Sequence, residues 1–131
     1  MRRCDKNGKV VRTVKEGTTY AYKKEPFCTP LVTMMDGTRG RRVFGEWTTS
    51  KSTAHKLYVV YAYGDHYPMY VWDEGAQAWY GNHSKYSPTT TKYPRMYDPD
   101  RVQEWFNAVD MVSITELGIV GFVQARLEGT L

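Results

Sequence analysis

The sequence has few cysteines, no long apolar run and no close histidine spacing, and each absence argues against a class of protein. Its two cysteines, Cys4 and Cys28, form no C-x-x-C motif, and we expect both thiols to be free. No apolar run comes near the roughly 20 residues that a membrane helix needs. The basic start MRRCDKNGKVV is not followed by the apolar stretch of a secretory signal. These absences predict a cytoplasmic protein.

Motifs for catalysis and metal binding are also missing. The three histidines, His55, His66 and His83, lack the H-x-x-x-H spacing of a metal site. The stretch GTRGRRVFG lacks the Lys-Ser/Thr ending of a phosphate-binding loop. A nucleophile such as Ser87 or Cys28 needs a histidine base supplied by the fold, and a loop hydroxyl or a core thiol explains each residue equally well. We therefore expect no catalytic residue, no metal and no cofactor, and a small hydrolase is a remote alternative.

Aromatic residues and an uneven charge distribution are what the sequence has in excess. Eleven Tyr, four Trp and four Phe make up 15% of the 131 residues, which suits a small sheet protein, a contact surface or both. Residues 1–56 hold thirteen Lys and Arg and five Asp and Glu, a formal charge of +8, whereas residues 57–131 carry −4. A basic half attracts phosphate backbones, although Lys and Arg also simply solvate exposed strands.

Alternating, β-branched and aromatic patterns predict strands over about the first ninety residues. The predicted strands are 9–14, 18–24, 28–35, 41–47, 56–63, 67–73 and 76–82. Glu16-Gly17 and Glu74-Gly75 indicate tight hairpin turns, and a Gly-containing loop at 36–40 joins another pair. The stretch 56–63 is apolar on both faces, which favours a central strand. Because long helices do not alternate with these strands, we do not expect a parallel, doubly wound sheet.

The tail of the sequence predicts helices. Pro99 follows a cap at Asp98, or alternatively precedes one at Asp100, and apolar residues then recur at helical spacing over 102–109. A Ser113-x-x-Glu116 capping box indicates a second helix that ends before Gly129.

Two glycines, Gly118 and Gly121, weaken the prediction of that second helix and leave a last strand open as the alternative. The sequence thus predicts a single α+β domain over residues 1–131. We expect an antiparallel β-sheet of about six or seven strands, mainly β to about residue 97, with one or two C-terminal helices packed on it.

Binding is the better supported function. Tyrosines at 58, 61, 63, 67, 70 and 80 can stack unpaired bases, although most must lie in the core, and we expect about two to be exposed. Lysine, arginine and hydroxyl side chains can contact phosphates. The predicted binding residues are Arg39, Arg41, Arg42, His66, Tyr80, Lys85, Tyr86, Ser87, Thr89, Thr90, Thr91, Lys92 and Arg95.

The segment KYSPTTTK, residues 85–92, has two open interpretations. In one, Lys85 and the 89–92 stretch face a partner while Tyr86 anchors the segment to the core. In the other, the Ser and Thr side chains satisfy backbone groups in an irregular connection.

A longer stretch, YVVYAYGDHYPMYVWDEGAQAWYGNHSKYSPTTTK, resembles a pattern in small uncharacterised proteins of bacteriophages and plasmids. There, VYSYG-x-H-x-P leads to W(Y/F)-x-N-x-x-KYS-x-TT(S/T)(K/R)H. The matching residues here are Val60, Tyr61, Tyr63, Gly64, His66, Pro68, Trp79, Tyr80, Asn82, Lys85, Tyr86, Ser87, Thr89, Thr90 and Lys92. Tyr93 replaces the final histidine, which further lowers the expectation of an enzyme. The resemblance implies a mobile genetic element as the setting and no particular reaction.

Together these features predict a small non-catalytic binding protein of a bacteriophage or other mobile element in the host bacterial cytosol. Its expected partner is nucleic acid, or a host ribonucleoprotein or nucleic-acid-processing protein, contacted through a basic, Tyr-rich surface. The alternative is a protein-directed inhibitor of a host defence system, similar in style to anti-CRISPR proteins. We expect no membrane partner, and a homodimer through an unpaired strand edge is as credible as a monomer.

Overall fold

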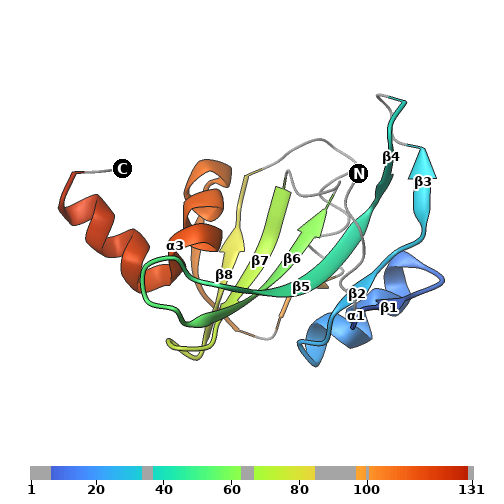
Figure 1. Ribbon diagram of the computed structural model, residues 1–131, viewed down its shortest axis with the longest axis horizontal. Coiled ribbons are helices and arrows are strands. Elements are labelled where there is room, and N and C mark those ends of the chain that lie inside the picture. The colour runs from blue at the N-terminus through green and yellow to red at the C-terminus, as the bar shows by residue number, and fades with distance from the viewer. Residues whose placement is uncertain (1–6, 34–36, 63–66, 85–96, 100, 130–131) are drawn as a thin grey trace.

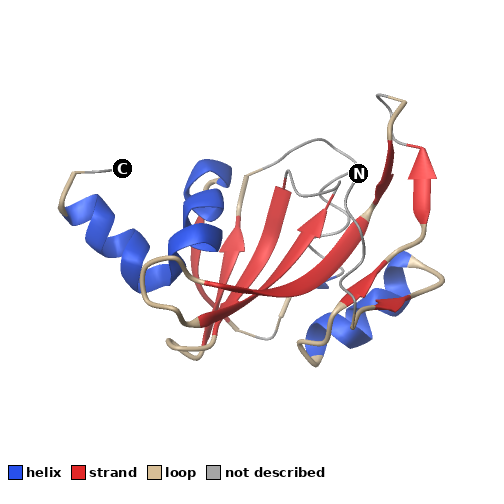
Figure 2. Cartoon of the chain, in the orientation of Figure 1, coloured by secondary structure: helices blue, strands red, loops and turns tan. Residues whose placement is uncertain are grey.

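A seven-stranded sheet forms the centre of the protein in the computed structural model, which describes residues 7–33, 37–62, 67–84, 97–99 and 101–129. Its strands lie in the order β1-β2-β5-β6-β7-β8-β9, and β3 pairs with β4 in a separate two-stranded sheet (Figure 1). The strands are β1 (Lys9–Val10), β2 (Phe27–Cys28), β3 (Leu31–Thr33), β4 (Arg39–Arg41), β5 (Val43–Thr49), β6 (Lys56–Ala62), β7 (Tyr67–Asp73), β8 (Ala78–Asn82) and β9 (Val102–Phe106). The described helices are α1 (Val14–Tyr22) and α3 (Ala108–Leu127) (Figure 2). The predicted α+β class is confirmed.

The sheet is covered by α1 on one face and by α3 on the other. Successive residues of a strand point to opposite faces, and β6 supplies both cores. Tyr58 and Val60 pack in the cluster that includes α1 residues, whereas Leu57 and Val59 pack in the cluster that includes α3 residues. All four side chains are buried. The prediction that this stretch is a central strand is confirmed, since β6 is the fourth of the seven strands.

The predicted hairpin of 67–73 with 76–82 is also confirmed as β7 and β8, which pair antiparallel. The connecting turn occupies residues 74–77 and ends at Gln77, whose φ is 52°. At Gly75, a Cβ would lie 2.1 Å from His55 Nδ1, so the turn needs glycine for close packing against the β5–β6 loop.

The predicted N-terminal hairpin is wrong, because residues 14–22 form α1. The Thr13 side chain caps the helix by accepting from the Glu16 N–H, and the Glu16 carboxylate accepts in turn from the Arg12 N–H at 3.0 Å. This reciprocal capping outweighs the β-branched composition of the stretch. Gly17 is buried inside the helix, where a Cβ would lie 2.4 Å from the Tyr97 hydroxyl and 2.5 Å from the Phe27 ring. The glycine therefore marks a close packing contact and not a turn.

The two long strands predicted at 28–35 and 41–47 are each divided near Thr29. The Thr29 N–H and hydroxyl both contact the Val43 carbonyl, and the Val43 N–H donates to the Thr29 hydroxyl at 3.1 Å. Pro30 follows and has no N–H for the ladder. Beyond this point the chain pairs again as β3 and β4, which extend away from the large sheet and which we call the arm (Figure 1).

The first predicted C-terminal helix is wrong, because residues 102–106 form strand β9. This strand runs parallel to β8, with Gly81 opposite Trp105. A Cβ at Gly81 would lie 2.6 Å from the Trp105 ring, so the glycine leaves room for the indole. The apolar residues at helical spacing were compatible with either structure, and the partner strand decides between them. Two of the sheet's strand pairs, β1–β2 and β8–β9, are parallel in a sheet predicted to be antiparallel.

The second predicted helix is confirmed as α3, although its start is wrong. The helix begins at Ala108 with Asn107 as its cap, and Ser113 lies inside it. It ends before Gly129, as predicted. By length and composition alone α3 is apolar enough to cross a membrane, contrary to the sequence analysis. A core helix meets the same criteria, and the absence of a membrane partner stays a prediction.

A kink at Gly118, with φ 73° and ψ 172°, divides α3 into two halves. Hydroxyls of Ser50 and Ser52 donate to the Leu117 carbonyl at 2.5 and 2.6 Å. On the other side of the kink, the buried Asp73 carboxylate accepts from the Ile119 N–H at 2.9 Å. Backbone groups freed by the kink are therefore satisfied from the β5–β6 loop and from the end of β7.

Cys28 is disulfide-bonded, so the prediction of a free thiol is wrong for this residue. Cys4, the other cysteine of the sequence, lies outside the described residues. The cytoplasmic location stays a prediction, and the disulfide weakens it because structural disulfides are rare in the cytosol.

Candidate functional site: an aromatic cleft and a basic arm

The structure describes four of the thirteen predicted binding residues: Arg39, Arg41, Arg42 and Tyr80. The other nine lie outside the described residues, namely His66, Lys85, Tyr86, Ser87, Thr89, Thr90, Thr91, Lys92 and Arg95. Both interpretations of the KYSPTTTK segment therefore stay predictions.

Tyr80 lies in the core beneath α3. Its side chain is 6% exposed and its ring centroid is 6.0 Å from that of Phe106. Burial raises the pKa of its phenol above the ordinary value. Tyr58, Tyr67 and Tyr70 are buried as well, and Tyr61 is half-buried, so the expectation that most of these rings belong to the core is confirmed. Base stacking on tyrosines of the sheet has little support from the described residues.

The predicted arginine cluster lies on the arm and its exit. Arg39 and Arg42 are exposed, whereas Arg41 is half-buried and its guanidinium donates to the Thr29 carbonyl at 3.0 Å. The three arginines thus lie on the arm and its exit, as the sequence predicted, but they have different roles. Arg41 braces the base of the arm, and Arg39 and Arg42 present charge to solvent.

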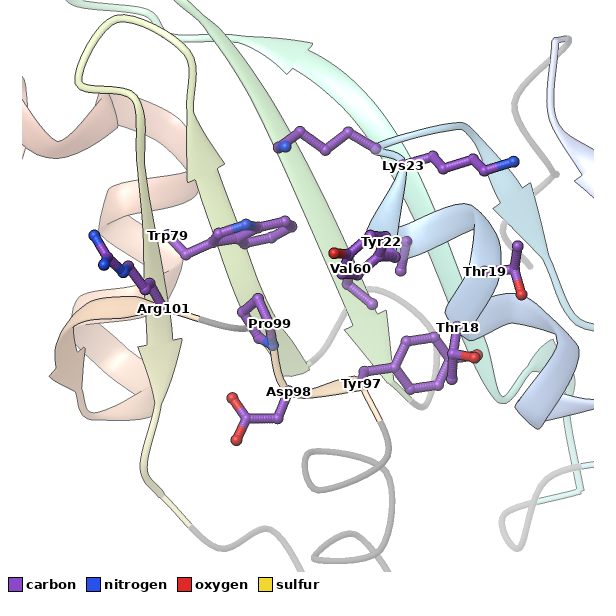
Figure 3. A pocket seen from close by; sticks show the side chains of 12 residues that line it. Thr18, Thr19, Tyr22, Lys23, Val60, Trp79, Tyr97, Asp98, Pro99 and Arg101 are labelled. Atoms are coloured by element: carbon purple, nitrogen blue, oxygen red, sulfur yellow. The ribbon is translucent and has the colours of Figure 1, made fainter.

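A cleft of about 740 Å³ lies between α1, the sheet and the segment that precedes β9 (Figure 3). Trp79 and Arg101 stand on one side of it and Thr18 and Thr19 of α1 on the other, and Tyr22 and Val60 lie between the two sides in this view (Figure 3). Its lining residues are Thr18, Thr19, Ala21, Tyr22, Lys23, Lys24, Val60, Trp79, Tyr97, Asp98, Pro99 and Arg101. No motif in the sequence predicted this cleft.

A row of aromatic rings crosses the α1 face of the sheet, and one of its members, Trp79, lines the cleft. The ring centroids are 5.4 Å apart for Trp47 and Tyr58, 6.3 Å for Tyr58 and Trp79, and 5.7 Å for Trp79 and Trp72. The row exists because strand register places Tyr58 opposite both Trp47 and Trp72, and Trp72 opposite Trp79. Cross-strand aromatic pairs stabilise a sheet, and here they also leave indole faces half-buried.

Lys24 places a cation over this row. Its Nζ lies 4.1 Å from the ring centroid of Trp72 and 5.8 Å from that of Trp79, within the range of cation–π attraction. The Trp72 indole N–H also donates to Glu74 at 3.0 Å. This bond, followed by those from Gln77, lowers the pKa of Glu74, with Lys24 as a further favourable charge. The carboxylate and the ammonium thus flank the same indole.

The backbone of Lys24 is held in an unusual conformation. It has φ 57°, in the left-handed region, at the position after a helix where glycine is favoured. The Lys24 N–H donates to the Ala21 carbonyl at 3.0 Å, and the Glu25 N–H donates to the Tyr20 carbonyl at 2.8 Å. The Lys24 carbonyl in turn accepts from the Trp47 indole N–H at 2.9 Å. These bonds form a helix-ending motif that directs the lysine toward the cleft.

Comparisons of this chain with known proteins found no matching family model, no matching curated protein and no matching solved structure. The resemblance to bacteriophage and plasmid proteins therefore stays a prediction. Among the residues that the structure describes, no group of three or more His, Cys, Asp or Glu side chains is placed to hold a metal ion. Function has to be inferred from the cleft and the arm themselves.

One signal in the sequence could have revealed the cleft. Once the β7–β8 hairpin is predicted, its register places Trp72 beside Trp79 on one face. Lys24 could not be found in the same way, because the stretch that contains it was predicted to be a strand. The contact between this lysine, at the end of a helix, and a hairpin distant in sequence can be recognised only from the tertiary fold.

Proposed function

We propose that this protein is a non-catalytic nucleic-acid-binding protein of a bacteriophage or other mobile element, and that the cleft holds unpaired bases. The observation that carries the proposal is Lys24, kept in a left-handed backbone conformation with its ammonium over Trp72. A residue other than glycine in that conformation costs about 1–2 kcal/mol. Such local strain is typical of functional sites.

The chemistry of the cleft suits a single-stranded polyanion. Indole faces stack on bases of any sequence, and each stacked base contributes about 1–3 kcal/mol. Lys23 and Arg101 are exposed at the edge of the cleft, where they are available to phosphates. Asp98 is the carboxylate among the lining residues, and three cations accompany it. The proposed ligand is therefore one or a few unpaired nucleotides of DNA or RNA.

The test is a titration of tryptophan fluorescence with short single-stranded DNA and RNA at two salt concentrations. We expect salt-sensitive quenching, with affinity reduced about 5- to 150-fold by Trp79→Ala, the equivalent of one stacked base. Trp79→Phe should retain part of the affinity because it keeps a ring. Lys24→Ala should weaken binding, whereas Lys51→Ala, which removes an exposed charge at the β5–β6 loop, should not. If the protein bound neither single-stranded DNA nor single-stranded RNA at low salt, the proposal would be overturned.

The second candidate function is that of a protein-directed inhibitor of a host defence system. It is favoured by exposed apolar side chains along the second half of α3: Val120 is 53% exposed, Val123 44% and Leu127 84%. A protein partner held by apolar contacts would bind with little dependence on salt. Under this candidate, Val123→Lys together with Leu127→Lys should abolish inhibition of the defence system while nucleic-acid binding is unaffected.

A further inference from the structure

The arm is a two-stranded ribbon that leaves the large sheet. Strands β2 and β5 are paired up to Thr29, and their continuations β3 and β4 pair with each other alone, Leu31 opposite Arg41 and Thr33 opposite Arg39. Among the described residues, neither β3 nor β4 pairs with a third strand. Figure 1 shows the arm extending beyond the end of the sheet, away from α3.

The arm and the residue that follows it carry exposed arginines. Arg39 on β4 and Arg42 directly after it are both exposed. The loop that joins β3 and β4 contains one carboxylate, Asp36, which lies outside the described residues. Arg41 holds the base of the ribbon through its bond to Thr29. Residues 31–42 hold three arginines and one carboxylate, so the arm and its exit carry a net positive charge, which suits a polyanionic partner.

We propose that the arm enters the major groove of a DNA duplex. This inference rests on the proposed nucleic-acid binding and adds a second, duplex-specific contact to it. The major groove of B-form DNA is about 12 Å wide and admits a two-stranded ribbon. Neighbouring strands lie about 4.8 Å apart, so the backbone of the two-stranded arm is narrower than that groove. Arginine is the side chain that most often contacts guanine there, through O6 and N7.

Duplex RNA provides the discriminating comparison. Its major groove is deep and narrow and does not admit protein side chains, although its phosphates carry the same charge. Simple attraction between the arm and phosphates therefore predicts similar binding to both duplexes. Entry into the groove predicts a preference for DNA that disappears when Arg39 and Arg42 are removed.

The experiment compares the wild-type protein, Arg39→Ala/Arg42→Ala and the matched control Lys51→Ala/Lys56→Ala, which removes two exposed charges at the opposite end of β5. Each is titrated by fluorescence anisotropy with the same sequence as duplex DNA, duplex RNA and single-stranded DNA over a range of salt. We expect the arm variant to lose the DNA preference and about two units of the log–log salt slope for duplex DNA. Single-strand binding should be unchanged, and the control variant should behave as wild type. Circular dichroism verifies that both variants are folded.

Three outcomes overturn the inference. Equal losses of affinity for duplex DNA and duplex RNA would mean that the arm contacts phosphates only. Unchanged affinity when guanine is replaced by 7-deazaguanine throughout the DNA would mean that no arginine contacts N7. Unchanged duplex binding by the arm variant would leave an acidic protein as the partner to test. If single-strand binding persists in these cases, the proposed function survives, whereas loss of all nucleic-acid binding by wild type would end both.

Discussion

The two faces of the sheet differ in what they carry and in how completely they are covered. On one face, the 20-residue α3 packs on a core of aliphatic and aromatic side chains, and Leu57, Val59 and Ile114 are fully buried. On the other face, the nine-residue α1 covers part of a row of aromatic rings, and Trp72 and Trp79 are only half-buried. Each strand contributes alternate residues to the two faces. The same strands therefore build a closed core and an open cleft.

The difference shows how a small domain combines stability with recognition. Close-packed aliphatic residues contribute free energy of folding through burial but present nothing to a ligand. Indoles contribute burial as well, and their remaining faces and N–H groups can contact a partner. Mutations on the α3 face should therefore change stability without changing affinity, and mutations in the cleft should mainly change affinity.

Removal of a fully buried side chain from the closed face gives the largest expected effect. Ile114→Ala should lower the free energy of unfolding by about 2–5 kcal/mol, measured by urea denaturation, because Ile114 is 0% exposed. Single-strand affinity of the protein that remains folded should not change. Val109→Ala on the same helix is the control, since Val109 is 76% exposed. A loss below 1 kcal/mol for Ile114→Ala would contradict a closed face.

Alkaline pH should destabilise the aromatic face. Burial raises the pKa of Tyr58 and Tyr70, so these phenols stay protonated in the folded state above pH 10, where they ionise in the unfolded state. The folded state then binds more protons, and stability decreases with rising pH by up to about 1.4 kcal/mol per unit for each tyrosine. Absorbance at 295 nm should rise together with the loss of circular dichroism. Tyrosinate that formed before unfolding would contradict this burial.

Addition of one methyl group should disturb the packing of α1. Gly17→Ala places a Cβ against the Tyr97 hydroxyl and the Phe27 ring, and overpacking of this kind costs about 1–3 kcal/mol. Thermal unfolding measures the loss, with Lys15→Ala on the exposed side of α1 as the control. Because α1 leads into Lys24, single-strand affinity should decrease as well. Reduced stability with full affinity would separate α1 packing from the cleft.

Substitutions of Lys24 should give the smallest change in stability and separate strain from function. Lys24→Gly relieves the left-handed conformation and should be more stable than Lys24→Ala by about 1 kcal/mol. Both variants should bind single strands equally weakly, because both lose the cation over Trp72. Urea denaturation and fluorescence titration measure the two quantities. Wild-type affinity in Lys24→Gly would show that the lysine does not act in binding.

Local patterns in the sequence were sufficient where neighbouring strands are also neighbours in the chain. The β6–β7–β8 meander was predicted because its strands alternate or are wholly apolar and tight turns join them. The stretch of α1 was misassigned because its β-branched and aromatic residues favour strands, whereas its capping pair lies within four residues, Thr13 to Glu16. β9 was missed because its residues pair with residues of β8 that are 23 or 24 positions earlier in the chain, as Trp105 does with Gly81, and no local pattern encodes such a pairing.

Prediction of the site failed for a related reason. The arginines of the arm were identified because they are adjacent in sequence, but the different role of Arg41 depends on its bond to Thr29. The cleft combines a helix end, a hairpin and the segment before β9. Its chemistry arises from tertiary contacts, above all the one between Lys24 and Trp72, which no motif in the sequence records.

The kink in α3 has a consequence for the order of folding. The second half of this helix receives its cap from Asp73, at the end of a strand 46 positions earlier in the sequence, and not from its own residues. An isolated segment of this length is too short to be helical in water. Its helical turns can therefore be nucleated only after β7 has joined the sheet. The C-terminal half of α3 should be among the last elements to fold, and its amide hydrogens should exchange with solvent before those of the first half.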